Sequence, residues 1–137
     1  MKIAVLLDTM WGGRRGRAPR HFRINPDNFS GRRLYRICGA DADLLVTNSC
    51  RELVNSTAQK GVPDPQWVAE NLALLEGLGC NVLLVCGKVA QKTFRESGYK
   101  TAMQVIETLH PAARCWTVQM MDHLSTMLGE LKRGDRK

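Results

Sequence analysis

Four short apolar runs alternate with helix-like segments along this chain, and this alternation restricts the possible folds more than any other feature of the sequence. The runs cover residues 2–7, 43–47, 80–86 and 104–109. They are too short for helices and rich in Val, Leu and Ile, which is typical of buried strands. Strands that alternate with helices predict a parallel sheet covered on both faces. We therefore expect an α/β fold, a three-layer α/β/α sandwich around a central four-stranded parallel sheet.

The segments between the runs carry helix signals. Asp64 suits an N-cap position, and Pro65 suits the first helical position that follows it. Gly39 is placed to end a helix over residues 31–38. Two more helices are predicted, one directly after Gly87-Lys88 and one over residues 117–132.

Length and composition indicate one globular domain. The chain has 137 residues, of which 44% are hydrophobic, so it can bury a core of its own. No apolar run approaches the length of about 20 residues that crosses a bilayer, and the short N-terminal run lacks a signal-peptide cleavage site. We expect a single domain over residues 1–137 that is cytoplasmic, monomeric and without a membrane partner.

The cysteine pattern argues against a metal or an iron–sulfur cluster. No two of the five cysteines have the two-residue spacing of a metal-binding clip: Cys38, Cys50, Cys80, Cys86 and Cys115. An odd number of scattered thiols is typical of reduced, mostly buried cysteines in an intracellular protein. We therefore expect no metal and no other cofactor.

The net charge of +7 is unevenly distributed. No acid lies between Asp8 and Asp27, whereas five arginines do: Arg14, Arg15, Arg17, Arg20 and Arg23. Residues 9–28 are predicted to form a loop, and a guanidinium fork matches phosphate oxygens. A Gly/Arg-rich loop beside a strand end predicts a polyanion partner, most simply nucleic acid. The alternative is a solvated loop that only keeps the protein soluble.

Polar or flexible residues follow the predicted strands: Asp8, Asn48, Gly87-Lys88 and His110. Open parallel sheets bind ligands at the carboxyl ends of their strands, so these residues are expected to lie close together. Asn48 offers the donor and the acceptor that reading the polar edge of a base requires. His110 can stabilise a developing anion, and Pro111 stops the last strand directly after it.

Each of these residues also has a simpler interpretation. An acid or an Asn after a strand often only caps a turn, and His-Pro often forms a plain turn. Gly87-Lys88 lacks the surrounding pattern of a phosphate-binding loop. The sequence shows no Ser-His-Asp order and no metal-ligand spacing, so it gives triad hydrolases and metalloenzymes little support.

Five segments, taken in order over roughly residues 3–116, carry a further signal. They are Leu7-Asp8-Thr9-Met10-Trp11, the HF…P.N.F pattern from His21 to Phe29, Leu45-Val46-Thr47-Asn48, residues 84–90, and His110-Pro111-Ala112. Together they resemble the motifs of the uracil-DNA glycosylase superfamily, and the second is similar to a segment of mismatch-specific uracil glycosylases. The resemblance implies a DNA glycosylase that flips uracil or a modified or mismatched base and hydrolyses its N-glycosidic bond.

The resemblance also implies a role for each matched residue. Asp8 would orient water or stabilise the sugar cation, and His110 would stabilise the leaving base anion. Phe22, or Trp11 as second choice, would stack on the flipped base while Asn48 binds its polar edge. Arg114 or Trp116 would enter the gap left by the base. The residues expected to bind DNA are Arg14, Arg15, Arg17, Arg20, Arg23, Lys88 and Arg114.

The chain departs from the superfamily pattern in its first and last motifs. Leu7, Met10 and Trp11 stand where the first motif normally has glycine and proline, and Ala112 replaces the usual Ser. Two alternatives therefore stay open. One is a member that binds DNA or a modified base without excision, and the other is an enzyme acting on free nucleotides. The basic segment argues against the second, because a small substrate does not need so many arginines.

Overall fold

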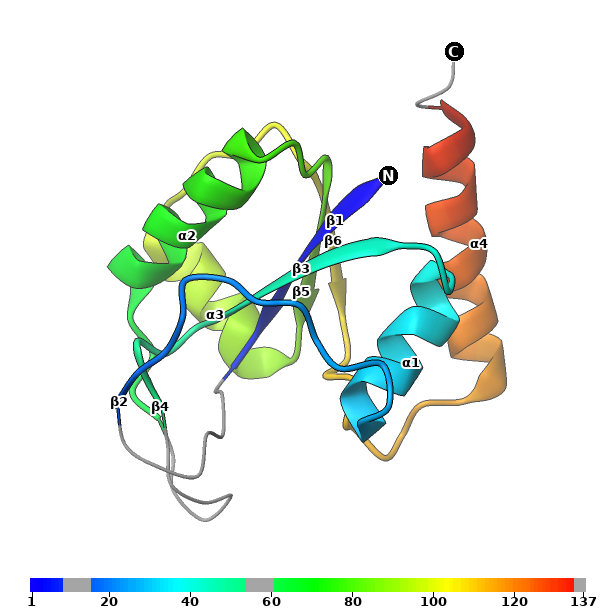
Figure 1. Cartoon of the computed structure of the whole chain (residues 1–137), viewed down its shortest axis with the longest axis horizontal. Coiled ribbons are helices and arrows are strands. Elements are labelled where there is room, and N and C mark those ends of the chain that lie inside the picture. The colour runs from blue at the N-terminus through cyan, green and yellow to red at the C-terminus, as the bar shows by residue number, and fades with distance from the viewer. Residues whose placement is uncertain (9–15, 54–60, 135–137) are drawn as a thin grey trace.

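The structure is a computed structural model that describes residues 1–8, 16–53 and 61–134, with side chains described over 1–8, 18–52 and 61–131. Its centre is a sheet of four parallel strands in the order β3-β1-β5-β6 (Figure 1). The strands are β1 (Lys2–Leu7), β3 (Asp43–Asn48), β5 (Val82–Cys86) and β6 (Gln104–Thr108). The prediction of a central four-stranded parallel sheet is confirmed.

Helices cover both faces of this sheet (Figure 1). One face is covered by α1 (Phe29–Cys38) and α4 (Val118–Gly134), and the other by α2 (Pro65–Gly77) and α3 (Lys88–Ser97). The chain therefore forms the expected three-layer α/β/α sandwich. In the described parts of the chain, no helix is long and apolar enough to cross a membrane.

Strand β1 shows why apolar and polar residues do not alternate in the apolar runs. Ile3 and Val5 belong to the core under α1 and α4, whereas Ala4 and Leu6 belong to the core under α2 and α3. All four side chains are buried, and burying an Ile, Val or Leu side chain contributes roughly 1.5–3 kcal/mol. A strand buried on both faces has to be apolar throughout.

Capping residues determine where two of the helices begin. The Asp64 carboxylate accepts hydrogen bonds from the backbone N–H groups of Gln66 and Trp67, at 3.0 and 3.2 Å, which confirms the predicted start of α2. Helix α1 begins at Phe29, two residues before the predicted start. Its cap is Asn28, whose Oδ1 accepts from the Gly31 N–H at 2.6 Å.

The prediction of a plain loop over residues 9–28 is wrong at two places in the part that the structure describes, and the other described residues of this segment form neither strand nor helix. Strand β2 (Gly16–Arg17) pairs antiparallel with β4 (Glu52–Leu53). Further along, Phe22 and Val46 exchange two backbone hydrogen bonds of 2.9 Å each. These bonds satisfy peptide groups on the open side of β3, which would otherwise need another partner.

Candidate functional site

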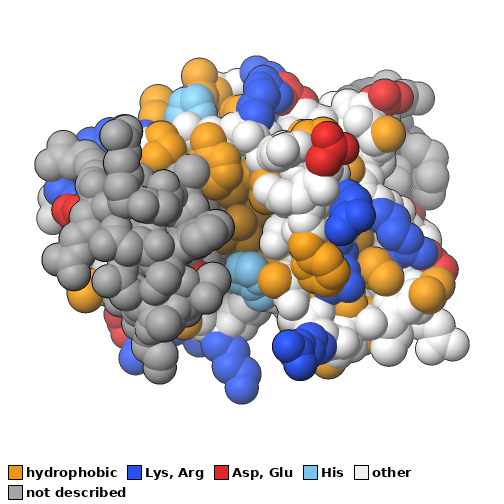
Figure 2. Space-filling view, turned by 60° about the horizontal axis from the view of Figure 1, so that its bottom comes forward, with side chains coloured by type: hydrophobic (Ala, Val, Ile, Leu, Met, Phe, Trp, Pro, Cys, Tyr) orange, Lys and Arg blue, Asp and Glu red, His pale blue; other side chains and the backbone are white. Residues whose placement is uncertain are grey.

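The four strands all end at one side of the sheet, which we call the carboxyl edge. The residues brought to it are Asp8, Asn48, Gly87 with Lys88, and His110. The strand register places Leu7 beside Asn48 and Cys86 beside Thr108. Figure 2, with this edge turned toward the reader, shows hydrophobic side chains and a histidine near the middle and Lys and Arg side chains beside them.

Asn48 is the least satisfied polar residue of this edge. The residue is 1% exposed, yet neither Nδ2 nor Oδ1 has a hydrogen-bond partner among the described residues. A buried polar group without a partner costs about 1–3 kcal/mol. The amide therefore has a donor and an acceptor to offer to a ligand.

Asn48 and Phe22 lie toward the same face of the sheet. Successive side chains of a strand point to opposite faces, and Val46 belongs to the core under α1 and α4. Asn48, two residues later, points to that face as well. Phe22 is bonded to Val46 through its backbone and packs against the same core. Phe22, which is predicted to stack on the base, thus lies on the same face of the sheet as Asn48, which is predicted to read the base edge.

Ser49 joins the ends of β1 and β3 and holds the backbone of Asp8. The Ser49 N–H donates to the carbonyl oxygens of Leu7 and Asp8, at 2.9 and 3.0 Å. The Ser49 hydroxyl donates to the Leu7 carbonyl as well, at 2.7 Å. These hydrogen bonds hold the backbone that carries the half-buried Asp8 side chain.

Gly87 makes room for His110 at the end of β5. Its φ is +91°, and a Cβ at this position would lie 3.3 Å from the His110 Cβ. The Gly87 N–H and the Gln91 side chain both donate to the Thr108 carbonyl, at 2.9 Å each. A glycine is therefore required here by its conformation and by the close approach of the histidine.

The imidazole of His110 has a defined tautomer in its neutral form. Its Nδ1 accepts a 3.0 Å hydrogen bond from the Ala112 N–H, so the hydrogen of the neutral ring sits on Nε2. Burial lowers the pKa of His110, and the carboxylate of Asp8 opposes this shift to a smaller extent. Burial thus favours the neutral ring, whose Nε2–H can donate a hydrogen bond.

The backbone that carries His110 is held from two sides. Arg33 of α1 donates from Nη1 to the carbonyl oxygens of Pro111 and Ala113, both at 2.8 Å. Trp116 donates from its indole nitrogen to the His110 carbonyl at 2.8 Å. Because this indole also packs against the core, Arg114, which is exposed, is the better placed of the two residues expected to enter DNA.

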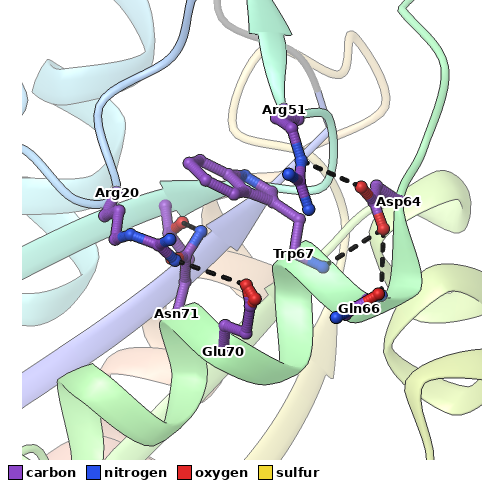
Figure 3. Close-up of polar contacts among 8 residues, drawn as sticks. Arg20, Arg51, Asp64, Gln66, Trp67, Glu70 and Asn71 are labelled. Carbon is purple, nitrogen blue, oxygen red and sulfur yellow. Dashed lines mark hydrogen bonds and ion pairs between the residues drawn. The ribbon is translucent and has the colours of Figure 1, made fainter.

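Arg20 is part of a cluster on α2 rather than of the carboxyl edge itself. Figure 3 shows it beside Trp67 and Asn71. Its guanidinium lies 4.9 Å from the centre of the Trp67 ring and donates to Asn71 Oδ1 at 3.0 Å. Arg51 lies over the same ring at 5.3 Å and pairs with Asp64 at 3.1 Å.

The other predicted DNA-binding residues do not all gather at one place. Lys88 and Arg114 are exposed at the carboxyl edge. Arg23 pairs with Asp43 at the start of β3, five residues and about 16 Å from Asn48. It is therefore separated from the site. Trp11, Arg14 and Arg15 lie outside the described residues, as does the side chain of Arg17.

Three contributors were absent from the sequence-based site. Arg33, Ser49 and Gln91 hold the residues around His110 and Asp8, but each makes its contacts with segments distant in sequence. A polar residue next to a strand end or on a helix is too common a feature to identify such a role. Within the described ranges, no group of three or more His, Cys, Asp or Glu side chains could hold a metal ion.

A scan against protein-family models finds no match to this chain. A search of the curated proteins finds none either.

Proposed function

We propose that the chain is a DNA glycosylase-like protein that flips uracil, or a modified or mismatched base, out of DNA and hydrolyses its N-glycosidic bond. The observation that carries this proposal is the buried, unpartnered amide of Asn48. It lies at the same sheet edge as a carboxylate, Asp8, and a neutral imidazole, His110. The motifs that resemble the uracil-DNA glycosylase superfamily support the same function.

Asn48 would recognise the base. A uracil-type ring presents hydrogen-bond acceptors and a donor on its polar edge. The Asn48 amide can donate to one of these acceptors and accept from the donor. A site with buried hydrogen-bonding groups rejects analogues that leave those groups unpaired by about 10⁴–10⁵. Phe22, on the same face of the sheet, would stack on the ring, and such contacts are worth about 1–3 kcal/mol per base.

His110 and Asp8 would carry the two charges that develop as the bond breaks. The base leaves with the bonding electrons and becomes an anion, toward which the Nε2–H of a neutral His110 can donate. The sugar becomes a cation, which the Asp8 carboxylate can stabilise while it orients the attacking water. Water adds to the sugar carbon, and its proton balances the charge of the released base.

Binding to DNA would rest on the basic side chains near this edge. Lys88 and Arg114 are exposed there, and the net charge of the chain is +7. Extruding a base costs a few kcal/mol, which contacts to phosphates have to offset. We expect the protein to act as a monomer in the cytoplasm.

The test is a strand-cleavage assay with purified protein. Labelled oligonucleotides would carry uracil, hypoxanthine, a thymine mismatch or hydroxymethyluracil, and alkali would convert each abasic site into a break. We expect breaks at one of these bases, and their loss in His110→Ala. The matched control is His123→Ala, since His123 is an exposed histidine of α4. Full activity in His110→Ala contradicts the proposed mechanism.

A second candidate function is binding of a base without excision. Leu7 is buried, and the register places it directly beside Asn48. A leucine where the superfamily has a small residue reduces the room for an attacking water. Retarded migration of one oligonucleotide without any strand break would favour this function.

A further inference from the structure

A basic groove lies between α1 and α4, next to the candidate site but not part of it. It has a volume of about 240 Å³ and is lined by Phe29, Arg32, Arg33, Arg36 and Met121. Helix α1 contains no acidic residue, so its exposed face is positively charged. A groove with three arginines and an aromatic ring fits an anionic ligand that also has flat, apolar surfaces.

Phe29 forms the flat part of this groove. Its side chain is 52% exposed, although it is a large apolar group at the first position of a helix. The Arg33 guanidinium lies over the ring, 4.7 Å from its centre. Because Arg33 is itself held by the carbonyl oxygens of Pro111 and Ala113, the ring and the guanidinium form a platform with a fixed position.

Arg32 and Arg36 supply the charge beside the platform. Arg32 is exposed, and the described residues show no ion pair for it. Arg36 is paired only loosely, with Nη2 lying 3.5 Å from the carboxylate of Asp122, and both side chains are largely exposed. An exposed pair of this kind contributes little to stability, so the guanidinium can exchange the carboxylate for a phosphate.

We propose that this groove binds an unpaired DNA strand, with one base stacked on Phe29 and the adjacent phosphates contacting Arg32 and Arg36. An aromatic ring can stack only on a base whose face is free, which a duplex does not offer. The groove is smaller than the roughly 300–1,000 Å³ of pockets that enclose small ligands, so it suits a strand that passes over the surface.

This inference rests on the proposed function in taking DNA as the partner, and it extends the bound region beyond the flipped base. Arg33 connects the two sites physically, because it contacts Phe29 on one side and the loop after His110 on the other. A strand that places one base near His110 therefore continues onto α1. The inference also predicts that the stretch of strand contacting α1 is unpaired, whether the target base lies in a single strand or beside an opened part of a duplex.

The test is fluorescence anisotropy of the full chain with a labelled 20-nucleotide oligo(dT) and with a blunt duplex of equal length, over a range of salt concentrations. We expect Phe29→Leu to weaken binding of the single strand about tenfold and to leave the salt dependence unchanged. Arg32→Gln should lower the slope of log affinity against log salt by about 0.7. Leu74→Ala and Arg95→Gln, at exposed positions on α2 and α3, are the matched controls and should bind like the unmodified protein.

Wild-type affinity for oligo(dT) in both α1 variants overturns the inference, and so does a duplex that binds as tightly as the single strand. Excision is measured in parallel to separate this result from the proposed function. If the protein excises no base but its affinity depends on Phe29 and Arg32, the proposed function fails and the groove stands. If it excises a base and both variants bind like the unmodified protein, only the groove fails.

Discussion

Two buried asparagines lie on opposite faces of the sheet, Asn48 in β3 and Asn71 in α2, and within the part of the chain that the structure describes only one of them has hydrogen-bond partners for its side chain. Asn71 is 0% exposed, donates to Thr47 Oγ1 at 3.2 Å and accepts from Arg20 at 3.0 Å (Figure 3). Asn48 is 1% exposed, and its amide has no partner among the described residues. The same side chain thus completes a structural network on one face and leaves its hydrogen bonds to a ligand on the other.

The largest expected effect is on catalysis when the unpartnered amide is removed. In Asn48→Leu the base loses both hydrogen bonds, and we expect the excision rate to fall by about 10³-fold or more. The free energy of unfolding should stay within about 0.5 kcal/mol of the original or rise, because a buried unsatisfied group is replaced by an apolar one of similar size. Single-turnover kinetics and urea unfolding of the same preparation measure the two quantities.

The matching change at Asn71 should have the reverse effect. Asn71→Leu leaves the buried Thr47 hydroxyl without its partner and removes one contact of Arg20, which keeps Trp67 and Glu70. We therefore expect the free energy of unfolding to fall by about 1–3 kcal/mol. Excision measured well below the unfolding transition should change less than threefold. If Asn71→Leu keeps its stability but loses excision, Asn71 is not the structural counterpart of Asn48, and this prediction is wrong.

A smaller effect is expected from the residue that holds the His110 loop. Arg33→Gln removes the Nη1 group that donates to the carbonyl oxygens of Pro111 and Ala113. We expect excision to slow about tenfold because the imidazole is less well placed. Arg95→Gln on α3 is the control and should leave the rate unchanged. Equal rates for all three proteins would show that the loop holds its position without Arg33.

The smallest effect is a pH dependence. Burial lowers the pKa of His110 from its ordinary value of 6.5, so the unfolded chain binds this proton more tightly than the folded protein. The stability that this residue contributes is therefore complete above pH 6.5 and is lost as the pH falls below it. Excision needs the neutral ring, and the pKa of this ring is lowered in the folded protein, so the rate should be level down to pH 6.5 and decline only as the pH falls further. A rate that increases as the pH falls would require a protonated His110 instead.

Most of the fold could be predicted because its signals are local. Buried strands of a parallel sheet are apolar throughout, and Asp64 with Pro65 marks a helix start within two residues. The pairing of Phe22 with Val46 could not be predicted, since it depends on which strand lies at the open edge of the sheet. The cap at Asn28 was also missed, although its residue type is favourable.

The candidate site was predictable where the topology alone brings residues together. Asp8, Asn48 and His110 each lie at or just after the carboxyl end of a parallel strand, so the placement of ligand sites at these ends predicts all three together. The roles of Asn71 and Arg33 depend on partners 24 to 80 residues away, and neither residue type reveals them. A polar residue among the apolar residues of a helix, such as Asn71, can be buried or exposed. Its burial and its partner can be predicted only when the strand packed against the helix is known.

The most direct test of the central claim is to observe the two side-chain amides themselves. Two-dimensional ¹⁵N–¹H spectra would resolve the NH₂ signals of Asn48 and Asn71, assigned by their loss in Asn48→Leu and Asn71→Leu. An oligonucleotide carrying the target base would then be added. We predict that the Asn48 signals shift while those of Asn71 stay in place. Asn48 signals that stay in place on a protein saturated with this DNA would contradict its role in reading the base.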